Sequence, residues 1–301
     1  MGIKYKLRAM KQVLLKNEHA SVSVEPLNSE FEKITISHRH CEAEISLYGG
    51  QVLRFKPTGQ QALLWLSDSA TYQKEKAIRG GIPLCWPWFG ANDKQVEPAG
   101  NHGFARQSQW TIDKVSADEQ ATTIILVLEG EQYHSLWPHA FKVVQTLVFG
   151  QSLKQSLAMS NLSTDDAQYS GALHTYFKVS HPSNVVIDTL TGVNFDDKLT
   201  GLANTQINRV SCVGPIDREY HSADVMTLVD SDYEHIITIT SSGCQQWVLW
   251  NPGSELAATM ADIHDQGEHE YVCLEAANTH WQTITAGTTV TMSQEIAVQR
   301  N

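Results

Sequence analysis

Two titratable residues, His174 and Glu275, lie in short segments where core-type and polar side chains alternate. In residues 172–179 (ALHTYFKV), Leu, Thr, Phe and Val fall on one face of an extended chain and the histidine falls on the other. Residues 271–277 (YVCLEAA) divide in the same way, with the glutamate opposite the apolar row. Because a period of two is typical of a β-strand, we expect both groups in mid-strand on rigid backbone, with His174 facing a cleft or solvent.

The two groups have complementary acid–base chemistry. Imidazole, with a pKa near 6.5, can donate a proton at neutral pH, and an ionised carboxylate can accept one. Opening of a cyclic hemiacetal needs both steps, because a base removes the anomeric hydroxyl proton while an acid protonates the ring oxygen. Rotation about the C1–C2 bond and reclosure then invert the anomer without a cofactor. The alternative is that His174 is a hydrogen-bonded sheet histidine and Glu275 an exposed sheet carboxylate.

Two further segments set an arginine beside glycines and aromatic residues: 79–90 (RGGIPLCWPWFG) and 101–106 (NHGFAR). The planar donor fork of arginine suits phosphate, glycine lets the backbone approach a ligand, and aromatic rings offer flat apolar surface. In a chain with a formal net charge of -11, this combination indicates a small anionic ligand with an apolar face, such as a sugar phosphate. Alternatively, Arg79 and Arg106 tie down loops through carbonyl groups or a carboxylate.

Strand patterns dominate the elements that must position these residues. Gly49-Gly50, Gly150 and Gly243 mark turns, and only residues 67–79 have the composition of a short helical connector. Many short strands without a linker or repeat predict an all-β fold, a large antiparallel β-sandwich in one domain over residues 1–301. The expected strands are 21–27, 31–38, 43–56, 122–129 and 141–149. A further strand begins at Leu153, with Leu153, Leu157 and Met159 on one face. The last expected strand has Val290, Met292, Ile296 and Val298 on one face.

Composition excludes several classes of partner. The acidic balance and the lack of a basic tract argue against nucleic acid and anionic membranes, and no apolar run approaches the length of a membrane span. Lys11 and Gln12 interrupt the apolar stretch near the amino end, so we expect no signal peptide. The odd number of scattered cysteines predicts reduced, mostly buried thiols in a cytoplasmic protein.

Six segments, in this order, resemble the hexose-6-phosphate mutarotases, the glucose-6-phosphate 1-epimerases of the aldose 1-epimerase superfamily. The resemblance covers about residues 45–301 and is specific because the order of the segments is kept. The segments are 79–90, 102–106 (HGFAR), 173–178 (LHTYFK), 217–218 (DR), 250–253 (WNPG) and 273–275 (CLE).

The resemblance implies a galactose mutarotase-like β-sandwich with a cleft on its concave face. It implies that His174 is the general acid and Glu275 the general base in the interconversion of the α and β anomers of hexose 6-phosphates, most of all glucose 6-phosphate. Arg79 and Arg106 match phosphate-binding arginines, and Asp217 matches an aspartate that binds sugar hydroxyls. The chain departs from the family pattern at two positions: Asn101, expected to contact the substrate, stands where Gln is common, and Glu219 replaces an aliphatic residue and is expected at the surface.

Several readings stay open. His102 either hydrogen-bonds the sugar or holds the loop between the arginines. The aromatic residues Trp86, Trp88, Phe89, Phe104 and Trp250 either stack on the sugar or pack in the core.

Other functions also stay open. The histidines of 38–40 and 264–269 lack the spacing of a known metal site, so we expect neither a metal nor another cofactor. A non-catalytic sugar-phosphate-binding module and a glycoside hydrolase are the alternative functions; the second usually needs two carboxylates. A sandwich of this kind can act as a monomer.

Overall fold

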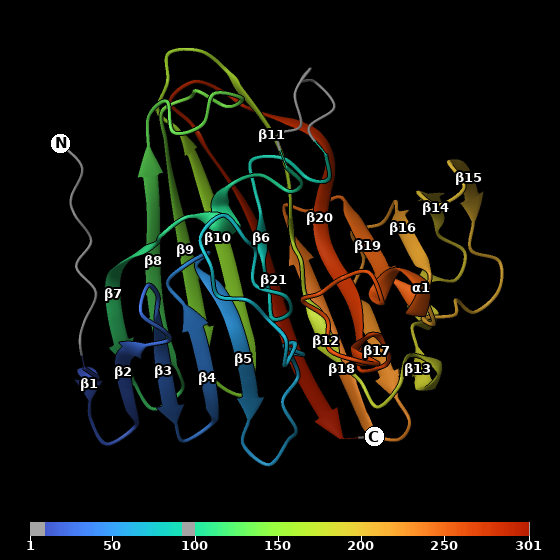
Figure 1. The fold of residues 1–301 in the computed structure, drawn as a ribbon, viewed down its shortest axis with the longest axis horizontal. Helices are drawn as coiled ribbons and strands as arrows, with labels where there is room; N and C mark the ends of the chain where they lie inside the picture. Colours follow the sequence, from blue (N-terminus) through green and yellow to red (C-terminus); the bar gives the residue numbers. More distant parts are fainter. Residues whose placement is uncertain (1–9, 92–99, 301) are drawn as a thin grey trace.

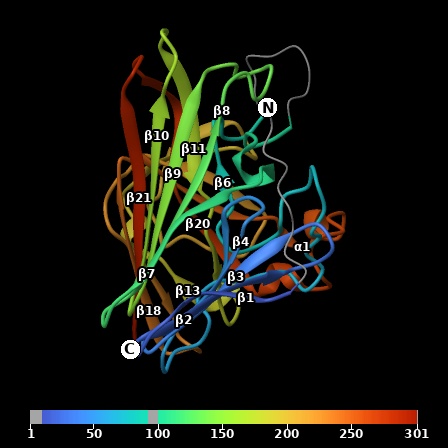
Figure 2. The same ribbon diagram turned by 90° about the vertical axis from the view of Figure 1, so that its left-hand side faces the viewer.

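The computed structural model describes residues 10–91 and 100–300. Antiparallel sheets stack in two layers (Figures 1 and 2), which confirms the predicted all-β sandwich. Among the described residues one α-helix is present, α1 (Gly253–Ala257). Four single 3-10 turns accompany it: η1 (Ala105–Gln107), η2 (Pro182–Asn184), η3 (Asp188–Leu190) and η4 (Gly267–His269).

The first layer is an eight-stranded sheet in the order β13-β17-β18-β21-β10-β9-β8-β7. The side chains of Leu153, Leu157 and Met159 are all buried on one face of β10, as their spacing predicts. Its strands are β7 (Thr111–Ala117), β8 (Thr122–Gly130), β9 (Phe141–Phe149), β10 (Leu153–Asn161), β13 (Val185–Val186), β17 (Met226–Asp230), β18 (His235–Ser242) and β21 (Thr289–Arg300).

The second layer consists of two sheets that lie side by side in Figure 1. The smaller is β1 (Gln12–Lys16), β2 (Ala20–Pro26), β3 (Glu32–His38), β4 (Cys41–Ser46) and β5 (Gln51–Pro57), paired in chain order. The larger, here called the site sheet, has the order β15-β14-β16-β19-β20-β11-β6, and β12 also pairs with β20. Its strands are β6 (Leu84–Cys85), β11 (Ala167–Leu173), β12 (Tyr176–Lys178), β14 (Asn194–Asp197), β15 (Leu202–Thr205), β16 (Ile216–Tyr220), β19 (Gln246–Asn251) and β20 (Tyr271–Ile284).

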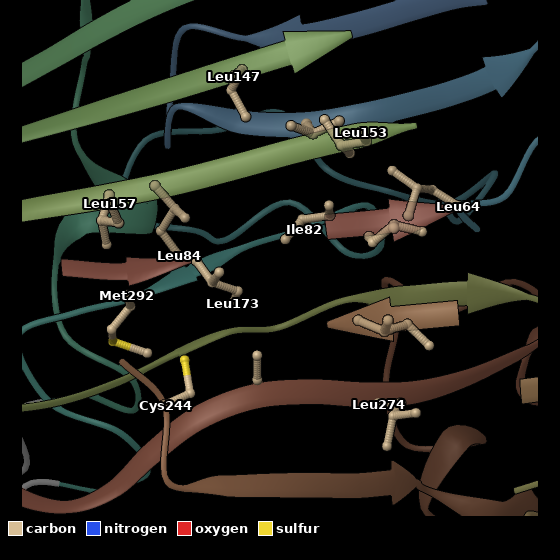
Figure 3. Close-up of a cluster of buried hydrophobic side chains, with 14 of the residues drawn as sticks. Leu64, Ile82, Leu84, Leu147, Leu153, Leu157, Leu173, Cys244, Leu274 and Met292 are labelled. Carbon is tan, nitrogen blue, oxygen red and sulfur yellow. The ribbon is translucent and has the colours of Figure 1, made fainter. Parts of the chain in front are cut away.

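The main hydrophobic core fills the space between the layers. Figure 3 shows Leu157 and Met292 of the first layer near Leu84 and Leu173 of the site sheet. Burying a side chain such as Leu157 contributes about 1.5–3 kcal/mol. Because successive side chains of a strand point to opposite faces, burial of Leu274 in this core turns Glu275 to the other face of the site sheet.

Three sequence-based expectations are wrong in detail. Residues 43–56 form two strands, because Gly49 and Gly50 take positive φ angles of 81° and 57° between β4 and β5. Residues 67–79 contain no helix: the Ser67 N–H donates to the Arg79 carbonyl at 3.2 Å, and pairing of the two ends overrides the helix-forming composition. Finally, residues 172–179 do not form one continuous strand, since His174 and Thr175 lie in a break between β11 and β12.

Two further expectations concern the cysteines and membrane spans. All five cysteines are free and buried, as predicted. Within the described ranges, none of the helices has the length and apolar character needed to cross a bilayer.

Candidate active site

A cavity of about 340 Å³, here called the central cavity, lies over the face of the site sheet that is turned away from the main core. All seven residues singled out from the sequence line it: Arg79, Asn101, His102, Arg106, His174, Asp217 and Glu275. Its other lining residues are Phe89, Gly90, Lys198, Val248, Trp250 and Met260. Segments from Arg79 to Glu275 therefore meet at one cavity.

The register of the site sheet aligns side chains from β16, β19 and β20 in two rows. Asp217 pairs with Trp250, which pairs with Cys273; in the next row Glu219 pairs with Val248, which pairs with Glu275. Residues directly opposite one another in neighbouring strands share a face of the sheet. The carboxyl groups of Asp217 and Glu275 consequently belong to the same face, separated by the width of β19.

His174 reaches this face from the strand break. Its backbone N–H donates to the Pro83 carbonyl at 3.1 Å, and its ring stacks on Tyr176 with a centroid distance of 4.8 Å and an interplanar angle of 6°. Its Nδ1 atom lies 3.3 Å from Glu275 Oε1. The break thus presents an imidazole held by packing directly beside the carboxylate.

Burial shifts the pKa values of this pair in opposite directions. Burial raises the pKa of Glu275 well above its usual range, and Asp217 adds to the effect, while Arg106 opposes it. Burial, followed by the charges of Arg106 and Arg79, holds the pKa of His174 well below its usual range. At neutral pH these directions leave one proton on the pair, held by Glu275, with His174 neutral.

The two arginines differ in how far their charge is already neutralised. Arg79 donates from Nε to Asp262 Oδ2 at 3.1 Å and from Nη1 to the Tyr176 hydroxyl at 2.9 Å. Arg106 donates from Nη2 to the Asn101 carbonyl at 2.9 Å, and its buried Nε has no hydrogen-bond partner among the residues that the structure describes. Within the described parts of the chain, no carboxylate lies in ion-pair range of Arg106, which lines the central cavity.

His102 has contacts that fit both hypotheses that the sequence left open, binding the sugar and holding the loop between the arginines. Its backbone takes a positive φ of 66°, its N–H donates to the Gly90 carbonyl at 2.7 Å, and its Nδ1 accepts from the Gly90 N–H at 3.1 Å. Burial lowers its pKa well below 6.5, so the ring is neutral at neutral pH. Because Nδ1 accepts a hydrogen bond, the proton of the neutral ring is on Nε2. The Nε2–H group can donate to a ligand, while the two contacts to Gly90 hold the loop in place.

Glu219 is not at the surface, where its departure from the family pattern led us to expect it. The side chain is 4% exposed and its Oε1 accepts from Lys198 Nζ at 2.9 Å. Strand β16 places Asp217 and Glu219 two residues apart, hence on one face, and their like charges interact. Burial and Glu219 together raise the pKa of Asp217 from 3.8 to about 6, and Lys198 opposes this shift.

We expect Asp217→Asn to raise the melting temperature at pH 7.5. The folded state raises the pKa of Asp217, so at neutral pH folding keeps a carboxylate charged where the charge is disfavoured, and stability falls as pH rises between the unfolded and folded pKa values. Below the unfolded pKa the group is protonated in both states and the effect disappears. Thermal unfolding of both proteins at pH 7.5 and pH 3.5 checks this; an equal difference at the two pH values would contradict it.

The aromatic candidates separate into two groups. Phe89 and Trp250 line the central cavity, whereas Trp86, Trp88 and Phe104 are buried in the main core. The sequence assigned no role to Lys198 or Asp262. Lys198 has no local pattern around it, and only the fold brings Asp262 to Arg79, with Oδ2 3.1 Å from Nε.

Two groups of described residues bring possible metal-ligand atoms within 4.8 Å of one another. One group, His174, Cys273 and Glu275, is buried and includes the acid–base pair. The other, Asp196, His221 and His280, is largely exposed. Neither includes the histidines of 38–40 or 264–269, and the expectation that the protein uses no metal stays a prediction.

Comparison with known proteins supports the same class of protein. A family profile described as "Aldose 1-epimerase" matches residues 32–297. A protein of Escherichia coli K12 named "Putative glucose-6-phosphate 1-epimerase" is 31% identical over 276 residues, 90% of this chain and 92% of its own length. A protein of the plant Cenchrus ciliaris with the same name is 32% identical, over 83% of this chain and 79% of its own length.

Solved structures agree with these sequence matches. The structure described as "a putative mutarotase" from Salmonella typhimurium has a TM-score of 0.86 and 28% identity, covering 93% of this chain and 94% of that one. A "galactose mutarotase-like protein" of Clostridium acetobutylicum, 16% identical, has a TM-score of 0.71 over 95% of this chain and 100% of that one, which shows the fold. The chain belongs to the aldose 1-epimerase family and has the galactose mutarotase-like fold predicted from its sequence.

Proposed function

We propose that the protein interconverts the α and β anomers of hexose 6-phosphates, with glucose 6-phosphate as the principal substrate. The observation that carries this proposal is Arg106, a half-buried residue whose guanidinium has no carboxylate partner among the described residues and which shares the central cavity with His174 and Glu275. A free sugar offers no charge to neutralise this group, whereas a phosphate dianion does. The names of the relatives support the same substrate class.

In the proposed reaction, the proton of Glu275 first passes to His174; Glu275 then removes the proton of the anomeric hydroxyl while His174 protonates the ring oxygen, which breaks the C1–O5 bond. The products of this step are the open-chain aldehyde, a neutral carboxyl group and a neutral imidazole. Rotation about C1–C2 exposes the other face of the aldehyde, and reclosure reverses both proton transfers. The single proton that the pair holds at neutral pH is what this cycle requires, because one group must be protonated and the other free.

The remaining lining residues have binding roles in this proposal. Arg106 binds the phosphate together with Arg79, which keeps its contacts to Asp262 and Tyr176. Asn101 and His102 contribute donors beside the arginines, and Asp217 accepts hydrogen bonds from sugar hydroxyls. We propose further that the chain acts as a monomer on this small molecule, without nucleic acid, membrane or cofactor; the five free thiols fit the reducing cytoplasm.

Exchange between the two anomers of glucose 6-phosphate, followed by NMR magnetisation transfer, tests the proposal. We expect the protein to accelerate the exchange strongly at catalytic concentration. A protein that only binds sugar phosphates would broaden or shift the resonances and leave the exchange rate at its uncatalysed value. Release of reducing sugar from an aryl glycoside, with no effect on anomer exchange, would instead indicate a glycoside hydrolase.

The pH dependence of kcat for glucose 6-phosphate follows from the opposite shifts of the pair. The raised pKa of Glu275 moves loss of the single proton to alkaline pH, and the lowered pKa of His174 moves uptake of a second proton to acid pH. We therefore expect kcat to stay level from pH 6 to pH 8. Rates at saturating substrate isolate the bound pair from the phosphate, whose second pKa is about 6. A rate that falls steadily as the pH rises through 6.5 would contradict the shifts.

A further inference from the structure

Lys198 is a cation at the central cavity to which neither the sequence nor the family resemblance gives a role. It follows β14, and its side chain, 52% exposed, lines the central cavity. It also lines a neighbouring cavity of about 550 Å³ that borders the first at Phe89 and Gly90. Lys198 therefore stands at the boundary between the two.

Glu219 fixes the position of this ammonium group. The carboxylate is 4% exposed, and Lys198 Nζ, 2.9 Å from its Oε1, is its ion-pair partner. A buried carboxylate is strongly destabilising without such a partner, so the pairing constrains the lysine side chain more than an exposed ion pair would. The lysine backbone is fixed too, since its N–H donates to the Asp217 carbonyl at 2.9 Å.

The held ammonium and the carboxylate of Asp217 complement each other. An ammonium group has three donors, of which the Glu219 contact uses one, and it accepts nothing. Asp217, when ionised, only accepts. A hydroxyl group both donates and accepts, so two neighbouring hydroxyls of a pyranose can donate to Asp217 and accept from Lys198.

We propose that Lys198 is a specificity-determining residue that binds a ring hydroxyl next to the one bound by Asp217, and that Glu219 is the positioning residue that holds it there. This inference rests on the proposed function. With the phosphate at Arg106 and the C1–O5 bond at His174 and Glu275, the hydroxyls left for Lys198 and Asp217 are those on C2, C3 and C4. An aliphatic residue at position 219, as in the family pattern, could not form this ion pair and would leave the lysine side chain unconstrained.

The test uses a double variant, Lys198→Met with Glu219→Leu. Changing Lys198 alone would leave Glu219 buried without a partner and endanger the fold, whereas two apolar side chains of similar volume preserve the packing. We expect KM for glucose 6-phosphate to rise about tenfold to a hundredfold, the value of a charge-assisted hydrogen bond, with kcat within about threefold of wild type. Glu219→Leu alone, which keeps the lysine but frees it, is expected to give a smaller rise in KM.

Deoxy substrates supply a readout that a structural role would not move. Anomer exchange is measured for glucose 6-phosphate and its 2-, 3- and 4-deoxy analogues with the wild type and the double variant. We expect the wild type to discriminate against analogues at two adjacent positions, and the double variant to lose the discrimination at one of them while that of Asp217 remains. Equal discrimination in both proteins at every position would overturn the assignment to Lys198.

The outcomes also separate this inference from the proposed function. If the wild type does not accelerate exchange of glucose 6-phosphate at all, the proposed function fails. If the wild type accelerates it and the folded double variant keeps the wild-type KM for every analogue, only the role of Lys198 fails. Circular dichroism and thermal unfolding establish that the variant is folded.

Discussion

Glu275→Gln and His174→Ala are each expected to lower the rate of anomer exchange of glucose 6-phosphate by about 10²–10⁴-fold, the contribution of one positioned acid or base. Glutamine keeps the shape of the glutamate but cannot take the anomeric proton, and alanine removes the donor for the ring oxygen. Nδ1 and Oε1 lie 3.3 Å apart and the two groups act in the same step of the proposed reaction, so the double variant should be little worse than either single variant.

Matched controls come from the same fold. Glu268 and His235 are buried, as the candidate pair is, but they do not line the central cavity. Glu268→Gln and His235→Ala should therefore retain the wild-type exchange rate in the magnetisation-transfer experiment, even where they lower stability. Full activity of Glu275→Gln or of His174→Ala would show that the acid–base pair is assigned wrongly.

Arg106→Met is expected to raise KM for glucose 6-phosphate about tenfold to a hundredfold, because one charge-assisted contact to the phosphate is lost. Removing Arg79 as well, in the Arg79→Ala, Arg106→Ala variant, should bring the loss in kcat/KM to about two to four orders of magnitude. Free glucose lacks the phosphate, so we expect its slow exchange to change little in either variant.

The comparison between the two substrates carries the phosphate assignment. Arg218→Met is a suitable control, since Arg218 pairs with Asp197 at 3.1 Å and does not line the central cavity. Arg218→Met should leave the ratio of the exchange rates of glucose 6-phosphate and free glucose at its wild-type value. Equal losses on glucose and glucose 6-phosphate in Arg106→Met would mean that the arginine supports the cavity and does not bind phosphate.

The chemistry of the site could be predicted from the sequence because it resides in side-chain types, whereas its geometry could not. Alternation in residues 271–277 correctly placed Glu275 on the polar face of a strand. That His174 lies beside it depends on β11 and β12 both pairing with β20, where Leu173 faces Ala276 and Tyr176 faces Cys273. Registers of this kind join positions a hundred residues apart, and local patterns do not encode them.

The errors have the same origin. Residues 67–79 have a helix-compatible composition, but the bridge between Leu66 and Gly80 closes them into an irregular excursion. Glu219 looked like a surface residue because glutamate is seldom buried, and only the fold brings Lys198 to pair with it. Both cases show tertiary pairing overruling a local preference.

The guanidinium of Arg106, which has no carboxylate partner in the described ranges, has a practical consequence for the choice of buffer. Orthophosphate and sulfate present the same tetrahedral oxygens as a sugar phosphate, so they should bind in the central cavity and raise the temperature of thermal unfolding. An anion present at a hundred times its Kd adds about 2.7 kcal/mol to the unfolding free energy. Buffers made from these salts would thus raise the measured unfolding free energy and inhibit the enzyme by competing with its substrate. Amine buffers with chloride are the better choice.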